Sequence, residues 1–363
     1  ARPGSVVRVK LDAAKANKGL GVRIGAHSDE LWHTESWRRF PAIDRVDRLD
    51  APETEIASAF GGLIYITVPA GTELGLVSVT IDGAVAAPRF VAGKTTAAEW
   101  TALRDAPAPW AELESDRFVV TLPSELVRSL VDPTPVLALW DDVLDASADL
   151  AAIPHARPRA ERFVVDRQIG AGYMHSGYPI MAHLDGGPMV LDTAAIEAAG
   201  SWGPFHEIGH NHQWGDWVLP GTIESSVNLW SVYVSEEVFG VPRAAAHPAL
   251  VAEERAKRTA AYLAAGAKLE DWQVWTALET YLELQEGFGW GPFKAVFAEY
   301  QTLSLADAPK DDAERIDEFC LRFGKAVGHD LGPFFTAWGL PLSSAVKAEL
   351  ATLPEWTEDP RAK

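Results

Sequence analysis

The chain has 363 residues, 47% hydrophobic and 23% charged, a balance that indicates a soluble globular protein long enough for two or three domains. Its formal net charge of −19, without clustered lysines and arginines, excludes nucleic acid and anionic membrane as main partners, because phosphate binding needs clustered cations. Cys320 is the one cysteine, which excludes a disulfide framework and a thiolate metal site, and its helical surroundings predict a buried position. No apolar run approaches the roughly 20 residues of a transmembrane segment.

The N-terminal hundred residues contain short, β-branched runs that are typical of an antiparallel sheet. Several of these runs alternate apolar and polar residues, and turn residues such as Gly, Pro and Asp bound them. We therefore expect residues 1–105 to form an accessory domain that is an antiparallel β-sandwich. The strands are predicted at residues 6–11, 21–25, 62–68 and 77–81.

A proline-rich segment, residues 106–110, is the predicted boundary to a second domain at residues 106–363. The first part of this domain, residues 106–215, has a mixed pattern of strands and helices. It predicts a small α/β upper lobe that ends with a helix at the HExxH motif of residues 206–210. The elements expected in this lobe are a helix at 135–144 and strands at 161–169 and 178–185.

A glycine-rich turn at residues 170–177 separates the two strands of this lobe. Tyr173, His175 and Tyr178 are candidate substrate contacts or oxyanion donors for the HExxH motif at residues 206–210, described next, because peptide hydrolysis at a metal benefits from a neutral donor opposite the ion. Pro179 has no N–H to donate, which predicts that the second strand is an edge strand able to hold an extended peptide.

The chain is organised around an HExxH motif at residues 206–210. On a helix, His206 and His210 are four residues apart, so both imidazoles project from one face toward a single point. Glu207 lies beside that point and can take a proton from metal-bound water. The motif therefore predicts zinc chemistry and a hydrolase in which Glu207 is the catalytic residue.

The third zinc ligand is predicted at Glu224, fourteen residues beyond His210. This interval lets the motif helix end, a loop containing proline and glycine turn the chain, and a second helix begin. Two histidines and one glutamate leave the fourth position of the metal open, as catalytic zinc requires. Asn228, one helical turn after Glu224, is predicted to hydrogen-bond a ligand or the substrate.

The remainder of the sequence is almost wholly helical and predicts a helical lower lobe at residues 216–363. Its aromatic residues are expected mostly in the core. Trp202 and Trp217, close to the motif, could stack on a sugar face, with packing against the motif helix as the alternative, and His212 stays unassigned. The helices are predicted at residues 229–238, 249–265, 271–285, 292–302, 313–327 and 342–350.

Four stretches of the chain carry motifs that are typical of one family: residues 203–213 with the HExxH motif, 221–228 with Glu224, 172–179 and 281–290. Together they resemble the enhancin-like metallopeptidase family (peptidase family M-sixty). Residues 24–29 and 60–65 also look like that family, especially its branch with vertebrate channel-associated factors. The resemblance covers nearly the whole chain.

The resemblance implies a gluzincin in which His206, His210 and Glu224 bind Zn²⁺ and Glu207 is the general base. Bacterial relatives are similar to mucin-directed peptidases that cut next to O-glycosylated Ser or Thr. The expected function is therefore that of a zinc-dependent endopeptidase acting on O-glycosylated, mucin-type glycoproteins by Glu-assisted attack of zinc-bound water.

A non-catalytic binding or regulatory protein that keeps the metallopeptidase fold is the alternative, as the channel-associated branch implies. The intact HExxH motif and its downstream glutamate favour the enzyme. A secreted or cell-surface location is expected although the first residues carry no signal-peptide pattern, and a cytoplasmic location is the alternative.

Overall fold

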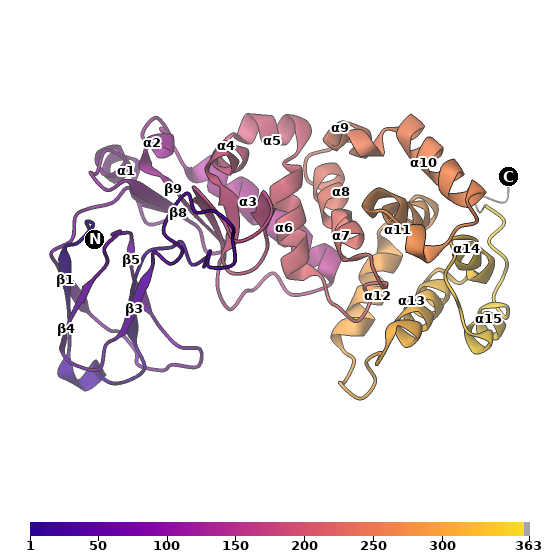
Figure 1. Ribbon diagram of the computed structural model, residues 1–363, viewed down its shortest axis with the longest axis horizontal. Coiled ribbons are helices and arrows are strands. Elements are labelled where there is room, and N and C mark those ends of the chain that lie inside the picture. The colour runs from indigo at the N-terminus through magenta and orange to yellow at the C-terminus, as the bar shows by residue number, and fades with distance from the viewer. Residues whose placement is uncertain (359–363) are drawn as a thin grey trace. The chain divides into compact units, whose positions relative to one another are not determined.

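A computed structural model describes residues 1–358 (Figure 1). The chain divides into two compact units, one of residues 1–141 and 158–192, the other of residues 142–157 and from Thr193 onward. The first unit holds the sheets, and the second is built from helices. Within residues 1–358, no helix combines the length and the apolar character needed to cross a bilayer.

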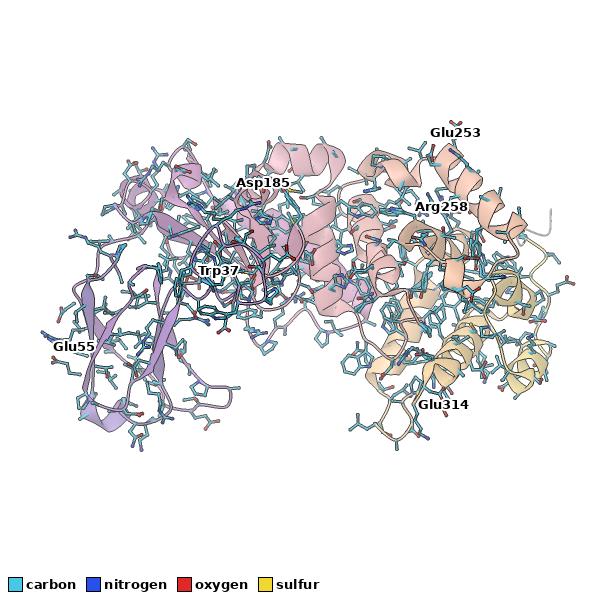
Figure 2. The ribbon with its side chains drawn as sticks, in the orientation of Figure 1. Trp37, Glu55, Asp185, Glu253, Arg258 and Glu314 are labelled. Atoms are coloured by element: carbon cyan, nitrogen blue, oxygen red, sulfur yellow. The ribbon has the colours of Figure 1, made fainter. Side chains whose placement is uncertain are left out.

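The N-terminal part of the first unit is an antiparallel β-sandwich, as predicted. In β1, Val7, Val9 and Leu11 are buried in a core shared by both sheets, while Arg8 and Lys10 alternate with them and face outward. Arg8 bonds Glu55 of β4, which is labelled in Figure 2, and the distance is 2.6 Å. One sheet has the order β4-β1-β6 and the other β3-β2-β5, from β1 (Val6–Leu11), β2 (Gly21–Ile24), β3 (Arg45–Arg48), β4 (Glu53–Ala57), β5 (Ile64–Thr67) and β6 (Val79–Asp82).

The rest of the first unit is a six-stranded mixed sheet of order β11-β12-β10-β9-β8-β7, which confirms the mixed α/β lobe. β10 is parallel to β9 and β12, whereas β8 and β9 are antiparallel. The centre of β10 is buried on both faces, which suits its continuous run of apolar residues. The strands are β7 (Arg89–Val91), β8 (Trp110–Glu114), β9 (Phe118–Pro123), β10 (Glu161–Asp166), β11 (Met174–His175) and β12 (Ile180–His183).

Strand pairing in this sheet differs from the sequence predictions in two ways. The expectation that β12 is an edge strand is wrong, because the turn at Gly177 returns the chain and β11 pairs with β12 on the side away from β10. β8 begins within the segment predicted as a linker, and β7 joins the same sheet ahead of the predicted boundary at 105/106. The domain division stays a prediction, and the pairing favours a boundary between β6 and β7.

Short helices complete the first unit. α1 begins with a capping box in which the Thr96 hydroxyl accepts from the Glu99 N–H and the Glu99 carboxylate accepts from the Thr96 N–H. The helices are α1 (Ala97–Leu103), α2 (Ser124–Val127) and α4 (Gly187–Leu191), and α3 (Thr134–Ala151) contributes residues to both units.

The second unit confirms the predicted helical lobe. Each helix predicted after Glu224 is present, with bounds shifted by at most three residues. Its helices are α5 (Thr193–Ala199), α6 (Trp202–His212), α7 (Ile223–Ser226), α8 (Asn228–Glu237), α9 (Arg243–Ala246), α10 (Ala252–Ala264), α11 (Val274–Phe288), α12 (Gly291–Gln301), α13 (Asp312–Val327), α14 (Gly332–Ala337) and α15 (Ser344–Leu350).

An aromatic core holds these helices together. Trp217 stacks on Phe297 with ring centroids 4.2 Å apart, and Trp230 lies 5.9 Å from Trp217 in the same stack. Cys320 is buried in this core as predicted, and burial raises the pKa of its thiol. The motif helix α6 belongs to this unit because it packs along α8 (Figure 1), although the sequence placed it in the mixed lobe.

Candidate metal centre

The HExxH motif lies on α6, which presents His206 and His210 from one face. A glycine at position 209 lets α6 approach α8 closely. A Cβ added there would lie 2.9 Å from Val227 Cγ2 and 3.0 Å from the Val227 carbonyl oxygen. This contact sets the two histidines beside the chain segment that carries Glu224.

The turn before α7 is fixed by buried hydroxyl groups. The Thr222 hydroxyl donates to the Leu219 carbonyl oxygen at 2.8 Å and accepts from the Tyr281 hydroxyl at 2.9 Å. Tyr281 is fully buried, and this burial raises the pKa of its phenol, so the hydroxyl stays a donor. The helix that starts after this turn presents Glu224 in its first turn.

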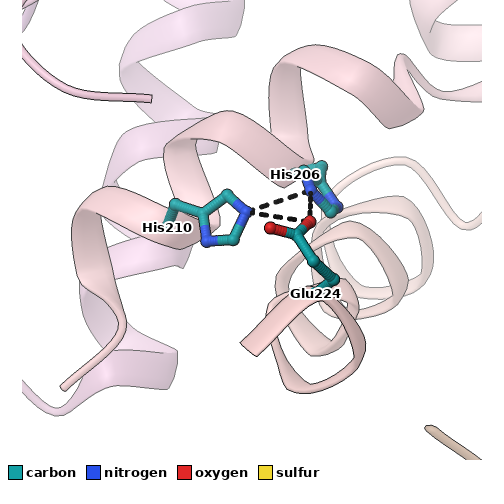
Figure 3. A group of neighbouring side chains, drawn as sticks. All are labelled: His206, His210 and Glu224. Carbon is teal, nitrogen blue, oxygen red and sulfur yellow. Dashed lines mark hydrogen bonds and ion pairs between the residues drawn. The ribbon is translucent and has the colours of Figure 1, made fainter. Parts of the chain in front are cut away.

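The three side chains predicted to converge lie together in the second unit (Figure 3). His206 Nε2 is 3.1 Å from His210 Nε2, and Glu224 Oε2 is 3.2 Å from the first and 3.4 Å from the second. Ligands about 2.0–2.1 Å from a tetrahedral zinc ion are about 3.3–3.4 Å from one another. The spacing of the three atoms therefore fits zinc.

The other nitrogen of each imidazole donates to a side-chain amide oxygen. His206 Nδ1 donates to Asn228 Oδ1 at 2.8 Å, and the Asn228 amide nitrogen donates to the Glu224 carbonyl oxygen at 2.8 Å, which fixes the amide orientation. His210 Nδ1 donates to Gln213 Oε1 at 3.0 Å, and the Gln213 amide nitrogen donates to the Ile223 carbonyl oxygen at 2.8 Å.

With the ring protons on Nδ1, each imidazole turns an Nε2 lone pair toward the other and toward the Glu224 carboxylate. Three electron-pair donors that face one another at 3.1–3.4 Å repel unless a cation lies between them. The donor set therefore fits a divalent metal ion. It is the only such group of His, Cys, Asp and Glu side chains within residues 1–358.

The site is open on one side. The Glu224 side chain is 58% exposed, whereas those of His206 and His210 are 18% and 13% exposed. Glu207, next to His206 on α6, is buried. The site is therefore accessible to solvent on the side of Glu224.

Tyr173, His175 and Tyr178 belong to the first unit, and their predicted contact with substrate stays a prediction. Tyr173 and Tyr178 are half-exposed, and the guanidinium carbon of Arg159 lies 3.4 Å from the Tyr178 ring centroid. His175 Nε2 bonds the Asp29 carboxylate at 2.8 Å.

The two tryptophans predicted near the motif have different positions. Trp202 is partly exposed beside His206 and lines a pocket there. Trp217 is 1% exposed within the aromatic core, so the sugar contact predicted as one alternative for it is wrong and Trp217 is a packing residue. The sequence placed Trp217 close to the motif, but the loop after α6 turns it into the core.

Sequence reasoning gave no role to Gln213 or His212. Gln213 lies three residues after His210 on the same helical face, a spacing that could have indicated its bond. His212 is buried: its Nδ1 donates to the Ile208 carbonyl oxygen at 2.7 Å and its Nε2 accepts from Arg157 at 2.9 Å. Burial lowers the pKa of His212 to about 4, so the ring stays neutral and anchors the end of α6.

Comparison with protein families covers most of the chain. Residues 83–339 match the model described as Peptidase M60, enhancin and enhancin-like. The chain belongs to this family. Residues 1–82 match the N-terminal domain of M60-like peptidases, so the β-sandwich corresponds to that domain. The resemblance stated from the sequence is confirmed.

Relatives of this M60 chain include channel-associated proteins. The chain is 48% identical over 359 residues to human TRPM8 channel-associated factor 2, which covers 98% of the chain and 39% of the relative. The Xenopus laevis TRPM8 channel-associated factor homolog is 44% identical over 360 residues, and the match covers 99% of this chain and 40% of that relative. The chain thus spans about two-fifths of the length of the curated relatives it matches.

Solved structures share the fold. A Bacillus anthracis protein of unknown function aligns with a TM-score of 0.80 and 24% identity, covering 99% of this chain and 73% of that one. A metallopeptidase in complex with Tn antigen aligns with a TM-score of 0.69 and 17% identity, and the match covers 98% of this chain and 72% of that one. At these identities the likeness concerns the fold, which is that of M60 metallopeptidases.

Proposed function

We propose that the protein is a zinc-dependent endopeptidase. The observation that carries this proposal is the triangle of His206 Nε2, His210 Nε2 and Glu224 Oε2, whose sides of 3.1, 3.2 and 3.4 Å match a tetrahedral zinc with an open fourth position. The family supports the same assignment, because its members are described as peptidases.

Each residue of the site would have a distinct role in the reaction. His206, His210 and Glu224 would hold Zn²⁺, which supplies Lewis-acid activation of water and of the scissile carbonyl. The Glu207 carboxylate accepts the proton of the attacking water and transfers it to the leaving amine. Asn228 and Gln213 keep the Nδ1 protons of the two histidines in place, so that the Nε2 lone pairs stay available.

O-glycosylated, mucin-type glycoproteins are the proposed substrates. Support comes from the fold shared with the metallopeptidase in complex with Tn antigen. Such substrates imply a secreted or cell-surface location for the peptidase.

A second candidate function is that of a non-catalytic binding or regulatory protein. The observation that favours it is the name of the relatives, TRPM8 channel-associated factors, which match at 42–48% identity. The complete set of metal-binding side chains and the buried Glu207 favour the enzyme, because a protein without turnover has no need of this combination.

Cleavage mapping separates these candidates. The zinc-loaded protein is incubated with an O-glycosylated mucin, with the same mucin after enzymatic deglycosylation, and with casein, and new peptide termini are identified by mass spectrometry. Cleavage of the glycosylated mucin alone is the expected result. Cleavage of all three substrates indicates a general endopeptidase, and cleavage of none, by protein containing one zinc per chain, supports the binding protein.

A further inference from the structure

A pocket of about 360 Å³ adjoins the candidate metal centre within the second unit. His206, Glu224 and Asn228 line one end, and Trp202, His247 and Trp275 line the other. Ligand pockets of proteins measure about 300–1,000 Å³, so this one has room for a single residue-sized group. A group bound there would lie next to the reacting carbonyl of a substrate.

The far wall of the pocket consists of three aromatic rings. The His247 ring stacks on Trp275 with centroids 4.3 Å apart, and the Trp202 ring is 4.8 Å from His247 and 5.8 Å from Trp275. Val274, which is 38% exposed, adds an apolar rim. Such a wall favours a flat apolar guest, because aromatic rings interact best with another ring in stacked or edge-to-face contact.

His247 is uncharged and has one nitrogen left to donate. Its Nδ1 accepts from the Ala249 N–H at 3.1 Å, which leaves the ring proton on Nε2. Burial lowers the pKa of His247, so the neutral ring persists at physiological pH. The wall therefore offers no positive charge to an acidic side chain.

An ion-pair network holds this wall in place. Arg258 of α10, labelled in Figure 2, donates to the Ala249 carbonyl oxygen at 3.1 Å and to Glu279 of α11 at 2.5 Å. Arg243 of α9 bonds Glu236 of α8 at 2.7 Å. Because three helices fix the segment that carries His247, the pocket is formed before a ligand arrives, which lowers the entropic cost of binding.

We propose that this pocket is a specificity subsite that takes the aromatic side chain of a substrate residue next to the scissile bond. The proposal rests on the proposed peptidase function. A pyranose ring is the competing occupant, because sugar hydroxyls can bond the N–H groups that His247, Trp202 and Trp275 carry, and the titration described next separates the two.

Binding of small probes tests the pocket without catalysis. The zinc-loaded Glu207→Gln protein is titrated with N-acetylphenylalanine amide, N-acetylalanine amide and N-acetylgalactosamine, and the NMR signals of the His247 ring are followed. We expect the phenylalanine amide to bind at least about tenfold more tightly than the alanine amide. Equal binding of the two amides, or tighter binding of the sugar, overturns the proposal.

Two variants of the pocket and one control locate this binding. Trp275→Ala removes part of the wall, and Val274→Trp fills the pocket from its exposed rim. Both should abolish the preference for phenylalanine with unchanged zinc content, whereas Trp214→Ala, at an exposed tryptophan outside the lining, should keep it. A preference that survives in both pocket variants contradicts the proposal.

Cleavage of a peptide library by the wild-type protein gives the second readout. An aromatic residue should be enriched at one position adjoining the cut, and Val274→Trp should remove that enrichment. Cleavage without any aromatic enrichment refutes the proposed subsite but not the proposed peptidase function. Absence of cleavage together with a phenylalanine preference in the binding assay refutes the proposed function and leaves the pocket as an aromatic-binding site.

Discussion

Replacing Asn228 by alanine removes two hydrogen bonds of 2.8 Å, one from His206 Nδ1 and one to the Glu224 carbonyl oxygen. Asn228 is 1% exposed, so water does not readily take its place. Each such bond contributes about 0.5–1.5 kcal/mol net, which gives about 1–3 kcal/mol for the pair. Since about 1.4 kcal/mol is a factor of ten in affinity, we expect zinc to bind about 10–100-fold more weakly.

Asn228→Asp is the matched control. The aspartate keeps an acceptor for His206 Nδ1, loses the donor to the Glu224 carbonyl oxygen and adds a negative charge that attracts the zinc ion, so its zinc affinity should stay within about tenfold of wild type. The assay is competition with a chromogenic chelator at pH 7.5, and circular dichroism checks the fold. Wild-type affinity in Asn228→Ala, or equal weakening in both variants, would refute the role given to this hydrogen bond.

Three further predictions concern α6 and its partners. Gly209→Ala places a methyl group 3.0 Å from the Val227 carbonyl oxygen. The variant should therefore be less stable by about 1–3 kcal/mol, despite a helix-propensity gain of about 1 kcal/mol, and should bind zinc more weakly. An unchanged free energy of unfolding in urea would contradict this close approach. His212 has a pKa of about 4 when folded and about 6.5 when unfolded, so the unfolded chain binds the proton first as the pH falls. As the pH falls from 6.5 to 4, the metal-free wild type should therefore lose up to about 3 kcal/mol of its free energy of unfolding through this residue, and His212→Gln should not show this loss. Parallel pH profiles of the two proteins in urea unfolding would contradict this role of His212. Glu224→Ala should lower the zinc content, and one zinc per chain by elemental analysis would remove Glu224 from the ligand set.

The helical part of the fold and the convergence of His206, His210 and Glu224 follow from local patterns. The spacing of His206 and His210 and the turn before Glu224 require only helix geometry and turn chemistry, which act over a few residues. The predicted strands β1, β2, β5 and β6 have the same basis in alternation. These elements lie within a few residues of their predicted positions.

Features that depend on tertiary pairing were missed. The segment at β8 has prolines before it and looked like a linker, yet Ala111 and Leu113 are buried once β9 pairs with it. Pro179 indicated an edge strand, but β11 covers that side. The roles of Gln213 and His212 depend on which helices lie opposite them, and the wall around His247 joins residues far apart in the sequence.

The most direct test compares zinc-loaded wild type with Glu207→Gln on the same glycosylated mucin. The variant replaces only the proton acceptor and keeps the three metal-binding side chains, so elemental analysis should find one zinc per chain in both proteins. New peptide termini counted by mass spectrometry should appear with wild type and fall by about 10²–10⁴-fold in the variant. Equal cleavage by both proteins, or none by zinc-loaded wild type, would contradict the account of this chain as a zinc endopeptidase.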